Sequence, residues 1–423
     1  MLDIHFIRTN LDKIKNGARI KGIAIDLDRI ISLDDEKREL LHMVETLRAE
    51  RNQNAKSLPK LSNREKEEAI RRGKELKEVL SIRETELLTL ETELGELLLL
   101  VPNPPLDGIP EGKDERDNIE IRKWGTIPHF DFTPKSHDEL GTFLDIIDIP
   151  RAAKFAGSRS YILKNEGALL ENAITRFALD TVISKGFAPF SIPVLVRDEA
   201  MIGTGFFPLG KEDTYIIEKD GLNLIGTSEV SLVSYYRNEI LEKKDLPKKL
   251  VSLSTCFRRE AGTYGKDTKG VYRVHQFQKV EQVIMCENDM ALSEKMHELL
   301  LANSEEILQK LEIPYRAALA CGAETGLGQV KKHEIESWMP SRNAYSETHS
   351  CSTLHEFQAR RSNIRYKDDA GKIHFVHTLN NTAIASPRIL IPLLELNQNK
   401  DGSVNIPKVL EPYMNGITTI IKK

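Results

Sequence analysis

The stretch Cys256–Glu281, CFRREAGTYGKDTKGVYRVHQFQKVE, decides how the rest of the sequence is interpreted. Its two ends are typical of strands, and a polar, basic segment from Gly262 to Gly270 separates them. Because side chains alternate along a strand, Arg258 and Glu260 would share one face of the first strand. One face of the return strand would carry an aromatic, a basic and an acidic side chain: Phe277, Lys279 and Glu281.

Such a surface could bind a nucleotide together with an amino acid. Arginines bind phosphates, an aromatic ring stacks on a base, and carboxylates accept from amino groups. A surface hairpin whose charges only pair with each other has the same spacing, so the pattern alone leaves both interpretations open. The sequence contains neither GxGxxG nor GxxxxGK[ST], and therefore predicts neither a Rossmann nor a P-loop nucleotide site.

The residues around this stretch indicate an α+β domain. From about Trp124 onward, helical patterns at 169–185 and 290–311 are mixed with β-rich runs at 251–257, 271–284 and 373–379. The strands follow one another across short turns instead of alternating strictly with helices. This order favours a mainly antiparallel sheet flanked by helices.

Residues 28–100 have a different texture, rich in Leu, Glu, Lys and Arg and without Phe, Tyr or Trp. Two heptad seams are separated by Pro59 and by a capping box at Ser62–Glu65, which predicts an antiparallel helical hairpin with arms roughly 45–55 Å long. The first seam is Ile30, Leu33, Lys37, Leu40, Val44, Leu47, Arg51, Asn54 and Leu58, and the second is Leu76, Leu80, Arg83, Leu87, Leu90, Leu94, Leu97 and Val101.

The outer part of this hairpin is basic although the chain as a whole has a net charge of −4. Between Arg48 and Lys77 there are ten basic and five acidic residues. A basic arm suits the phosphate backbone of a nucleic acid. A coiled coil used for oligomerisation is the alternative.

The remaining features set the domain limits and the compartment. The segment 101–118 holds four prolines and two glycines, so we expect an N-terminal domain at 1–100, a linker at 101–123 and a second domain at 124–423. Four cysteines without close spacing, an N-terminus unlike a signal peptide and no apolar run long enough for a bilayer favour a cytoplasmic protein without a membrane partner.

The stretch 256–281 resembles motif 2 of class II aminoacyl-tRNA synthetases and, in its detail FRxEAGxxGxxxxGxxRxHQFxKVE, the seryl-tRNA synthetases. The resemblance extends along the chain in order through Met1–Asp3, the helical hairpin, the 101–118 segment, Gly226–Glu229, Trp338–Pro340, Glu347–Ser350, Phe357–Arg361 and Thr378–Arg388. It implies a class II catalytic domain in a homodimer. The implied reaction uses ATP and Mg²⁺ to activate L-serine, releases pyrophosphate and transfers serine to the 3′ end of tRNA(Ser), with tRNA(Sec) as a further candidate.

Two other functions stay open at this point. One is a synthetase-like paralogue that activates a small amino acid for a non-tRNA acceptor, although the basic arm argues against it. The other is a non-enzymatic RNA-binding protein, which the retained arginines disfavour. Serine-dependent pyrophosphate exchange and tRNA charging separate all three.

The resemblance also assigns residues to subsites. Arg258 would bridge the ATP α-phosphate and the serine carboxylate, and Arg388 would bind the γ-phosphate; these two are the expected catalytic residues. The full ATP set is Arg258, Arg259, Glu260, Arg273, Phe277, Glu347, Thr348, His349, Ser350 and Arg388. Glu347 and Ser350 would ligate Mg²⁺. Serine would meet Thr227, Ser228, Glu229, Arg258, Glu281 and Thr382, and tRNA would meet Arg48, Arg51, Lys56, Arg71, Arg72 and Lys74.

The segment 379–388 departs from the family pattern. Thr382 stands where common bacterial members have serine, and it keeps a hydroxyl. Asn381 stands in place of a glycine and is expected to preserve a turn, because Asn tolerates left-handed backbone angles. Pro387 fixes the backbone beside Arg388.

Overall fold

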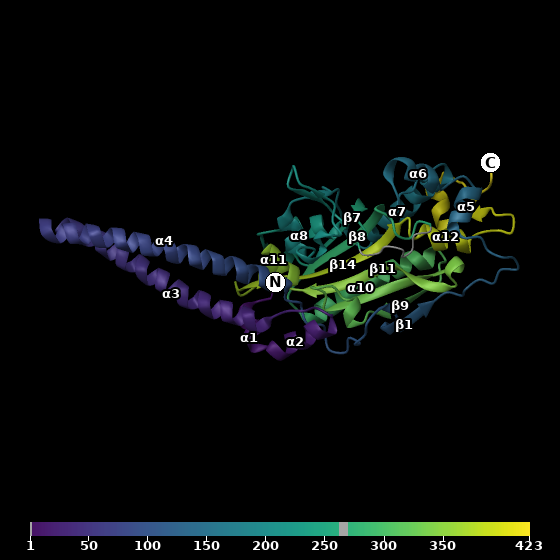
Figure 1. Ribbon diagram of the computed structural model, residues 1–423. Helices are drawn as coiled ribbons and strands as arrows, with labels where there is room; N and C mark the ends of the chain where they lie inside the picture. Colours follow the sequence, from purple (N-terminus) through teal and green to yellow (C-terminus); the bar gives the residue numbers. More distant parts are fainter. Residues whose placement is uncertain (1, 262–269) are drawn as a thin grey trace. The chain divides into compact units, whose positions relative to one another are not determined.

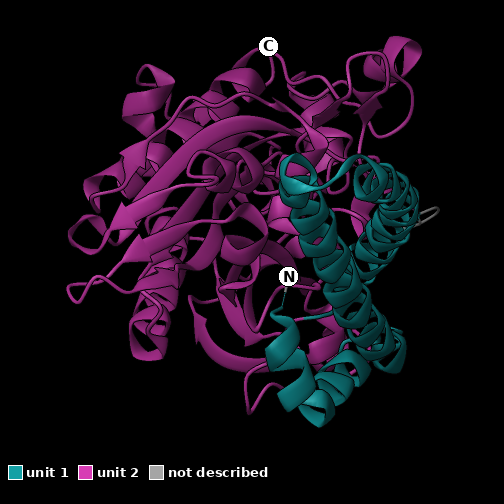
Figure 2. Ribbon diagram, turned by 90° about the vertical axis from the view of Figure 1, so that its left-hand side faces the viewer, with its two compact units in different colours: residues 1–102 teal, residues 103–423 magenta. Residues whose placement is uncertain are grey.

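The structure, a computed structural model, describes residues 2–261 and 270–423. Most of the polar loop expected at 262–270 therefore lies outside the described residues, as does Met1. The chain forms two compact units, residues 1–102 and 103–423 (Figure 2). Nowhere in the described ranges is a helix both long enough and apolar enough to cross a bilayer.

Unit 1 contains the predicted helical hairpin. Helix α3 spans Leu27–Ser57 and α4 spans Asn63–Leu100, with a 3₁₀ turn at Leu58–Lys60 that contains Pro59 (Figure 1). The capping box is formed, because the Ser62 backbone N–H donates to the Glu65 carboxylate over 3.0 Å. At 31 and 38 residues the helices are about 46 and 57 Å long. Helices α1 (Ile4–Thr9) and α2 (Leu11–Ile20) precede them.

The seam of the hairpin is apolar near its base and polar further out, as the sequence predicts. Ile30, Leu33 and Val44 of α3 are fully buried. Further out, the Asn54 amide donates to the Ala69 carbonyl over 2.8 Å. The second seam differs at its end, where Leu98 instead of Leu97 is the buried residue. Arg48–Glu84 and Arg72–Glu50 ion pairs join the helices on the surface.

Unit 2 is built on an eight-stranded sheet in which every neighbouring pair is antiparallel except β2–β7. This confirms the expected α+β class. In spatial order the strands are β1 (Ile119–Trp124), β9 (Tyr315–Leu319), β10 (Lys331–Met339), β11 (Ala344–His355), β14 (His377–Ser386), β8 (Gln276–Cys286), β7 (Lys248–Phe257) and β2 (Ala188–Pro189).

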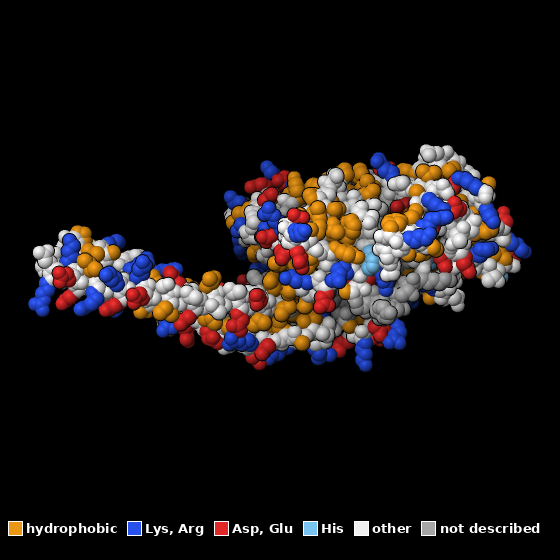
Figure 3. Space-filling view, turned by 45° about the horizontal axis from the view of Figure 1, so that its top comes forward, with side chains coloured by type: hydrophobic (Ala, Val, Ile, Leu, Met, Phe, Trp, Pro, Cys, Tyr) orange, Lys and Arg blue, Asp and Glu red, His pale blue; other side chains and the backbone are white. Residues whose placement is uncertain are grey.

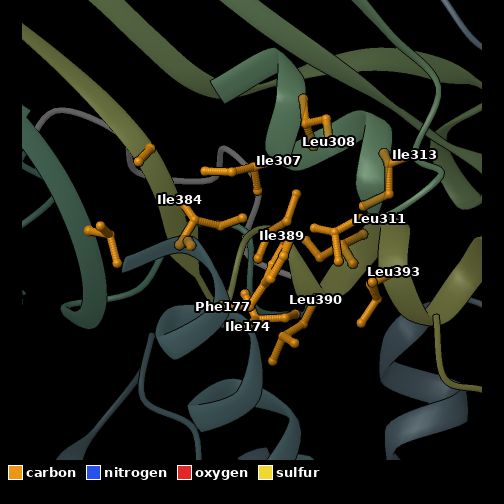
Figure 4. Packing of buried hydrophobic residues seen from close by; sticks show 14 of the residues in the cluster. Ile174, Phe177, Ile307, Leu308, Leu311, Ile313, Ile384, Ile389, Leu390 and Leu393 are labelled. Carbon is orange, nitrogen blue, oxygen red and sulfur yellow. The ribbon is translucent and has the colours of Figure 1, made fainter. Parts of the chain in front are cut away.

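Helices α7 (Glu166–Ser184) and α10 (Met290–Lys310) cover one face of this sheet and form its main core with it. Side chains from both helices and from β14 meet there (Figure 4): Ile174, Phe177, Ile307, Leu308 and Ile384. Because this face is occupied by apolar packing, polar side chains that alternate with the core residues point to the opposite face.

Short elements complete unit 2. The helices are α5 (His137–Phe143), α6 (Ile149–Ala156), α8 (Asp198–Thr204), α9 (Glu229–Ser234), α11 (Phe357–Ser362) and α12 (Leu390–Leu396). Three small sheets are formed by β3 (Leu195–Val196), β5 (Leu222–Leu224) and β4 (Ile216–Ile217); by β13 (Ile373–Phe375), β12 (Arg365–Lys367) and β6 (Ile240–Glu242); and by β15 (Val404–Asn405) and β16 (Thr419–Ile420).

The boundary between the parts differs from the expected linker at 101–123. The Asn103 backbone N–H donates to the Leu327 carbonyl and the Leu106 N–H to the Val330 carbonyl, both over 2.9 Å. Residues 119–124 form edge strand β1. The prolines prevent regular structure, but the backbone groups between them still bond to unit 2, which therefore begins at Asn103.

The buried cluster of Figure 4 gives a stability prediction. Leu390→Ala, at a residue that is 1% exposed, should lower the free energy of unfolding by about 2–5 kcal/mol because it leaves a cavity. The same substitution at Leu209, which is 58% exposed, should change it by about 0.5 kcal/mol or less. Urea unfolding followed by circular dichroism measures both, and equal effects would contradict the packing described here.

Candidate active site

One pocket of unit 2 brings together most of the predicted ATP residues and, from the predicted serine residues, Arg258 and Thr382. It lies at the ends of β7 and β14 and over β8 and β11, on the face opposite α7 and α10. It is lined by Arg258, Glu260, Tyr272, Val274, Phe277, Lys279, Glu347, Thr348, His349, Ser350, Thr382, Ala385, Ser386, Pro387 and Arg388.

The register of the central strands places these side chains. Glu281 of β8 pairs with Thr382 of β14, and the Thr382 hydroxyl donates to the Glu281 carboxylate over 3.2 Å. A β-bulge between Thr382 and Ile384 lets the first residue face the pocket and the second face the core. Without the bulge, residues two apart would point to the same face.

Asn381 has a different role from the one expected. It lies inside β14 and is not one of the described residues with a positive φ, so it does not form a left-handed turn. Its side-chain oxygen accepts from Gln282 and from Ser304 of α10, each over 2.6 Å, and its NH₂ group donates to the Ser350 carbonyl. Asn381 therefore links β8, β11, β14 and α10 below the pocket.

Arg258 and Glu260 both reach the pocket, but not by strand alternation. Strand β7 ends at Phe257, and β8 begins only at Gln276 instead of near residue 271. A backbone bond from Arg258 to His275 over 3.0 Å still ties the two segments together. Glu260 has a left-handed backbone (φ 54°), which turns its carboxylate toward the pocket and to within 3.4 Å of the Arg273 guanidinium.

An aromatic ring and cations form the nucleotide side of the pocket. The Arg258 guanidinium lies 5.4 Å from the centre of the Phe277 ring. Arg388 pairs with Glu347 over 3.2 Å and stacks 4.3 Å from the centre of the Tyr272 ring. Tyr272 also donates its hydroxyl to the Glu347 carbonyl over 3.1 Å. These contacts hold the cations in place before any ligand arrives.

The charge state of Glu347 follows from its neighbours. Burial by itself raises the pKa of this carboxyl, but the nearby cations Arg388, Lys332 and Arg258 outweigh burial and bring the pKa below its usual value. Glu347 is therefore ionised at neutral pH and can act as an oxygen ligand for a cation.

Behind the nucleotide side lies a small group of buried polar side chains. The Lys279 ammonium bonds the Thr227 hydroxyl and the Glu281 carboxylate, each over 2.7 Å. Glu229 accepts from Gln358 over 2.6 Å and from Asn380 over 2.8 Å. Burial, and next the nearby Glu281, raises the pKa of Glu229 to about 7.

Three predicted residues have their side chains committed elsewhere. Arg259 donates to the Glu212 carbonyl over 2.9 Å and does not line the pocket. The Ser228 hydroxyl bonds that of Ser254 over 2.7 Å inside the protein. Thr348 lines the pocket, but its hydroxyl bonds Ser337 and the Ile335 carbonyl.

The sequence interpretation missed several residues of the site. Lys279 was placed on the correct face but not assigned a role, although the two-residue spacing to Glu281 carried that signal. Asn380 was also missed, although it lies two residues before Thr382 in β14 and therefore on the same face of the strand. Gln358 lies in the Phe357–Arg361 stretch that carries the family resemblance, but it was assigned no role. Tyr272 gave no signal, because it lies outside the sheet and reaches the site only through the tertiary fold.

Within unit 1 the predicted phosphate-binding residues are all exposed. Arg48 and Arg72 are engaged in ion pairs with Glu84 and Glu50. In the described part of the chain, Arg51, Lys56, Arg71 and Lys74 form no ion pair. Figure 3 shows Lys and Arg side chains gathered toward the outer end of the hairpin, interspersed with acidic ones.

Comparisons with known proteins show which family the whole chain resembles. The family described as "Seryl-tRNA synthetase N-terminal domain" matches residues 1–105, and "tRNA synthetase class II core domain (G, H, P, S and T)" matches 214–397. A serine–tRNA ligase of Deinococcus radiodurans is 47% identical over 98% of each chain.

Two solved structures are also similar. The seryl-tRNA synthetase of Pyrococcus horikoshii complexed with ATP is 39% identical, with all of both chains covered and a TM-score of 0.90. The cytoplasmic serine–tRNA ligase of Naegleria fowleri in complex with AMP is 28% identical, with 98% of this chain and 96% of that chain covered and a TM-score of 0.84.

Proposed function

The chain belongs to the serine–tRNA ligase family, and we propose that the pocket described above is where it joins L-serine to ATP. As a member of this family it activates serine as seryl-adenylate with release of pyrophosphate and transfers serine to the 3′ end of tRNA(Ser). One observation carries the assignment of the pocket. Arg258, Arg388 and Glu347 converge beside the buried group of Thr227, Glu229, Lys279, Glu281 and Thr382.

Activation requires the serine carboxylate to attack the α-phosphorus of ATP, although both groups are anionic. Arg258 lies where it can bind both and so reduce their repulsion. Phe277 and Glu260 offer a ring for the adenine and an acceptor for its amino group, and Arg273 and Arg388 hold the phosphates that leave as pyrophosphate. The reaction needs no nucleophile from the protein, because positioned charges supply the catalysis.

Mg²⁺ fits the same pocket. Glu347 is ionised and Ser350 lines the wall beside it, so a carboxylate and a hydroxyl oxygen are available. In the described ranges no group of three or more His, Cys, Asp and Glu residues could form a closed metal cage. This suits Mg²⁺, which binds one or two protein ligands and otherwise water and phosphate oxygens. When bound it would neutralise phosphate charge.

Serine would be recognised by the buried group. Glu229 offers a carboxylate to its ammonium, and Glu281 with Thr382 offers partners to its hydroxyl. Alanine would leave these buried groups without a partner, which is an effective way to exclude it. Ser228 and Arg259 have no part in this arrangement, since their side chains are bonded elsewhere.

The remaining steps concern the tRNA and the assembly. We propose that the exposed cations of the helical hairpin bind the tRNA backbone, that tRNA(Sec) is accepted where it occurs, and that the enzyme works as a cytoplasmic homodimer. The basic outer end of α3 and α4 supports the tRNA contact, and the likeness to the cytoplasmic enzyme of Naegleria fowleri supports the compartment.

The first test replaces Arg258 by Ala. Serine-dependent exchange of pyrophosphate into ATP should fall by about 10³-fold or more in kcat/KM, because a charge-assisted contact to the reacting phosphate is lost. Arg259→Ala is a matched control, since its guanidinium lies outside the pocket, and it should stay within about threefold of wild type. Equal losses, or exchange that survives without Arg258, would refute the assignment.

A second test concerns the arm. Replacing Arg51, Lys56, Arg71 and Lys74 together by Ala should raise the KM for tRNA about tenfold or more and flatten its dependence on salt, because fewer counterions are released. Serine-dependent exchange without tRNA is the internal control and should be unchanged. Aminoacylation measured at several salt concentrations gives both values. A tRNA KM and salt slope equal to wild type would remove these residues from the tRNA contact.

A third test uses the pKa of Glu229, about 7. The serine ammonium prefers the ionised carboxylate, which is lost as pH falls through 7. The KM for serine should therefore rise by about threefold to tenfold from pH 8 to pH 6. Glu229→Gln should raise the KM at pH 8 and abolish this dependence. A serine KM in the wild type that is constant over this range would contradict the role of Glu229.

A further inference from the structure

Lys279 is a buried ammonium whose hydrogen bonds are not complete. The residue is 4% exposed in the middle of β8, and its side chain lines the active-site pocket. An ammonium has three hydrogens to donate. Within the described residues it has two acceptors, the Thr227 hydroxyl and the Glu281 carboxylate. The third hydrogen is left for a group inside the pocket.

The hydrogen bonds of the Thr227 hydroxyl give this residue a different role. Its hydroxyl oxygen accepts from the Lys279 ammonium over 2.7 Å and from the Glu229 backbone N–H over 3.2 Å. A hydroxyl has two lone pairs, so both are used. The Thr227 hydroxyl therefore cannot also accept from a substrate ammonium, although Thr227 is one of the residues expected to meet serine. What it does instead is hold Lys279.

Glu229 remains as the acceptor for the ammonium of the substrate. One of its oxygens accepts from both Gln358 and Asn380, and its other oxygen has no bond within the described residues. The substrate ammonium is thereby assigned to Glu229, which leaves the Lys279–Glu281 pair for the substrate's side chain.

A hydroxyl group is both a donor and an acceptor, whereas a carboxylate only accepts and an ammonium only donates. The Lys279 nitrogen and the Glu281 oxygen are 2.7 Å apart, so one hydroxyl oxygen can lie within hydrogen-bond distance of both. Thr382, which lines the pocket, bonds the same Glu281 oxygen and limits the space around it.

We propose that Lys279 is a specificity-determining residue that donates its third ammonium hydrogen to the hydroxyl oxygen of serine, while Glu281 accepts the hydroxyl hydrogen. The proposal rests on the function proposed above and adds a direct contact to it. The Lys279–Glu281 pair thus donates a hydrogen bond to a hydroxyl and accepts one from it, whereas a methyl group can do neither.

The charge balance of the site supports this role. The charged groups near Glu229 are Glu281 and Lys279 of β8 and Arg258, which follows β7. Its hydrogen-bond partners are the neutral amides of Gln358 in α11 and Asn380 in β14. The two cations, Lys279 and Arg258, thus balance the two carboxylates, Glu229 and Glu281. Serine is a zwitterion without net charge, so its binding does not change this balance. Since Lys279 lowers the pKa of Glu229, its loss should move the pH dependence of serine binding upward.

A purely structural role for Lys279 makes different predictions. If it only neutralised Glu281 inside the fold, its removal would reduce stability without changing the choice between substrates. Selectivity and the pH profile are therefore the informative measurements, with thermal unfolding as the control for folding.

The experiment compares wild type with Lys279→Met in pyrophosphate exchange driven by serine or alanine. We expect the KM for serine to rise about 30-fold, the serine-to-alanine ratio of kcat/KM to fall at least about tenfold, and the KM for ATP to stay within about threefold. The pH midpoint of the serine KM should also move upward. Lys249→Met, in neighbouring β7 and outside the pocket, is the matched control.

A folded Lys279→Met variant with wild-type selectivity overturns the proposal. If that variant does not fold, Lys279→Arg keeps the positive charge but cannot place a hydrogen at the same point. Loss of selectivity by about fivefold or more in this variant supports the donor role, and wild-type selectivity overturns it. A wild-type enzyme without serine-dependent exchange would instead refute the proposed function itself, so the two failures can be told apart.

Discussion

The alternation of side chains along β8 and β14 is the constraint on which the rest of the catalytic unit depends. In β8, Val280 and Ile284 face the core under α7 and α10, whereas Lys279 lines the pocket and Glu281 pairs with it on the same face. The burial of the first pair fixes the position of the second, because a slip of one residue would exchange the two faces. In β14 the bulge after Thr382 allows Thr382 to face the pocket while Ile384 faces the core. Hydrophobic packing therefore determines where the charges lie.

Several charged side chains on this face are held in place by defined partners. Lys279 pairs with Glu281, and Arg388 pairs with Glu347 while stacking on Tyr272. Removing one member of such a pair leaves an uncompensated charge, which makes the network strongly interdependent. The same pairing holds the cations at fixed positions before ATP binds, and catalysis by positioning requires this preorganisation.

The sequence predicted what local patterns determine. Heptad spacing with Pro59 and the Ser62–Glu65 box specified the hairpin, and the motif 2 stretch singled out Arg258, Glu260 and Phe277, which line one pocket in the structure. Strand alternation failed for Arg258 and Glu260 because β7 ends at Phe257, and the chain turns through a left-handed residue that no periodicity reveals. Asn381 was misjudged because its partners, Gln282 and Ser304, come from other elements. The hydrogen bonds of Arg259 to the Glu212 carbonyl and of Ser228 to Ser254 likewise join segments far apart in the sequence, so local patterns could not predict them.

Glu229 and the three charged groups around it are balanced in charge, but their hydrogen bonds are not complete. Among the described residues, the Glu229 carboxylate accepts from the neutral amides of Gln358 and Asn380, and burial, followed by the nearby Glu281, raises its pKa to about 7. A substrate ammonium supplies that cation, and a substrate hydroxyl supplies the partner that the Lys279–Glu281 pair lacks. Because the strands already fix these groups, little reorganisation is needed on binding, and the interaction energy can go into discrimination. An amino acid that lacks either group leaves a buried polar atom unpaired, so selectivity follows from the same register that builds the core.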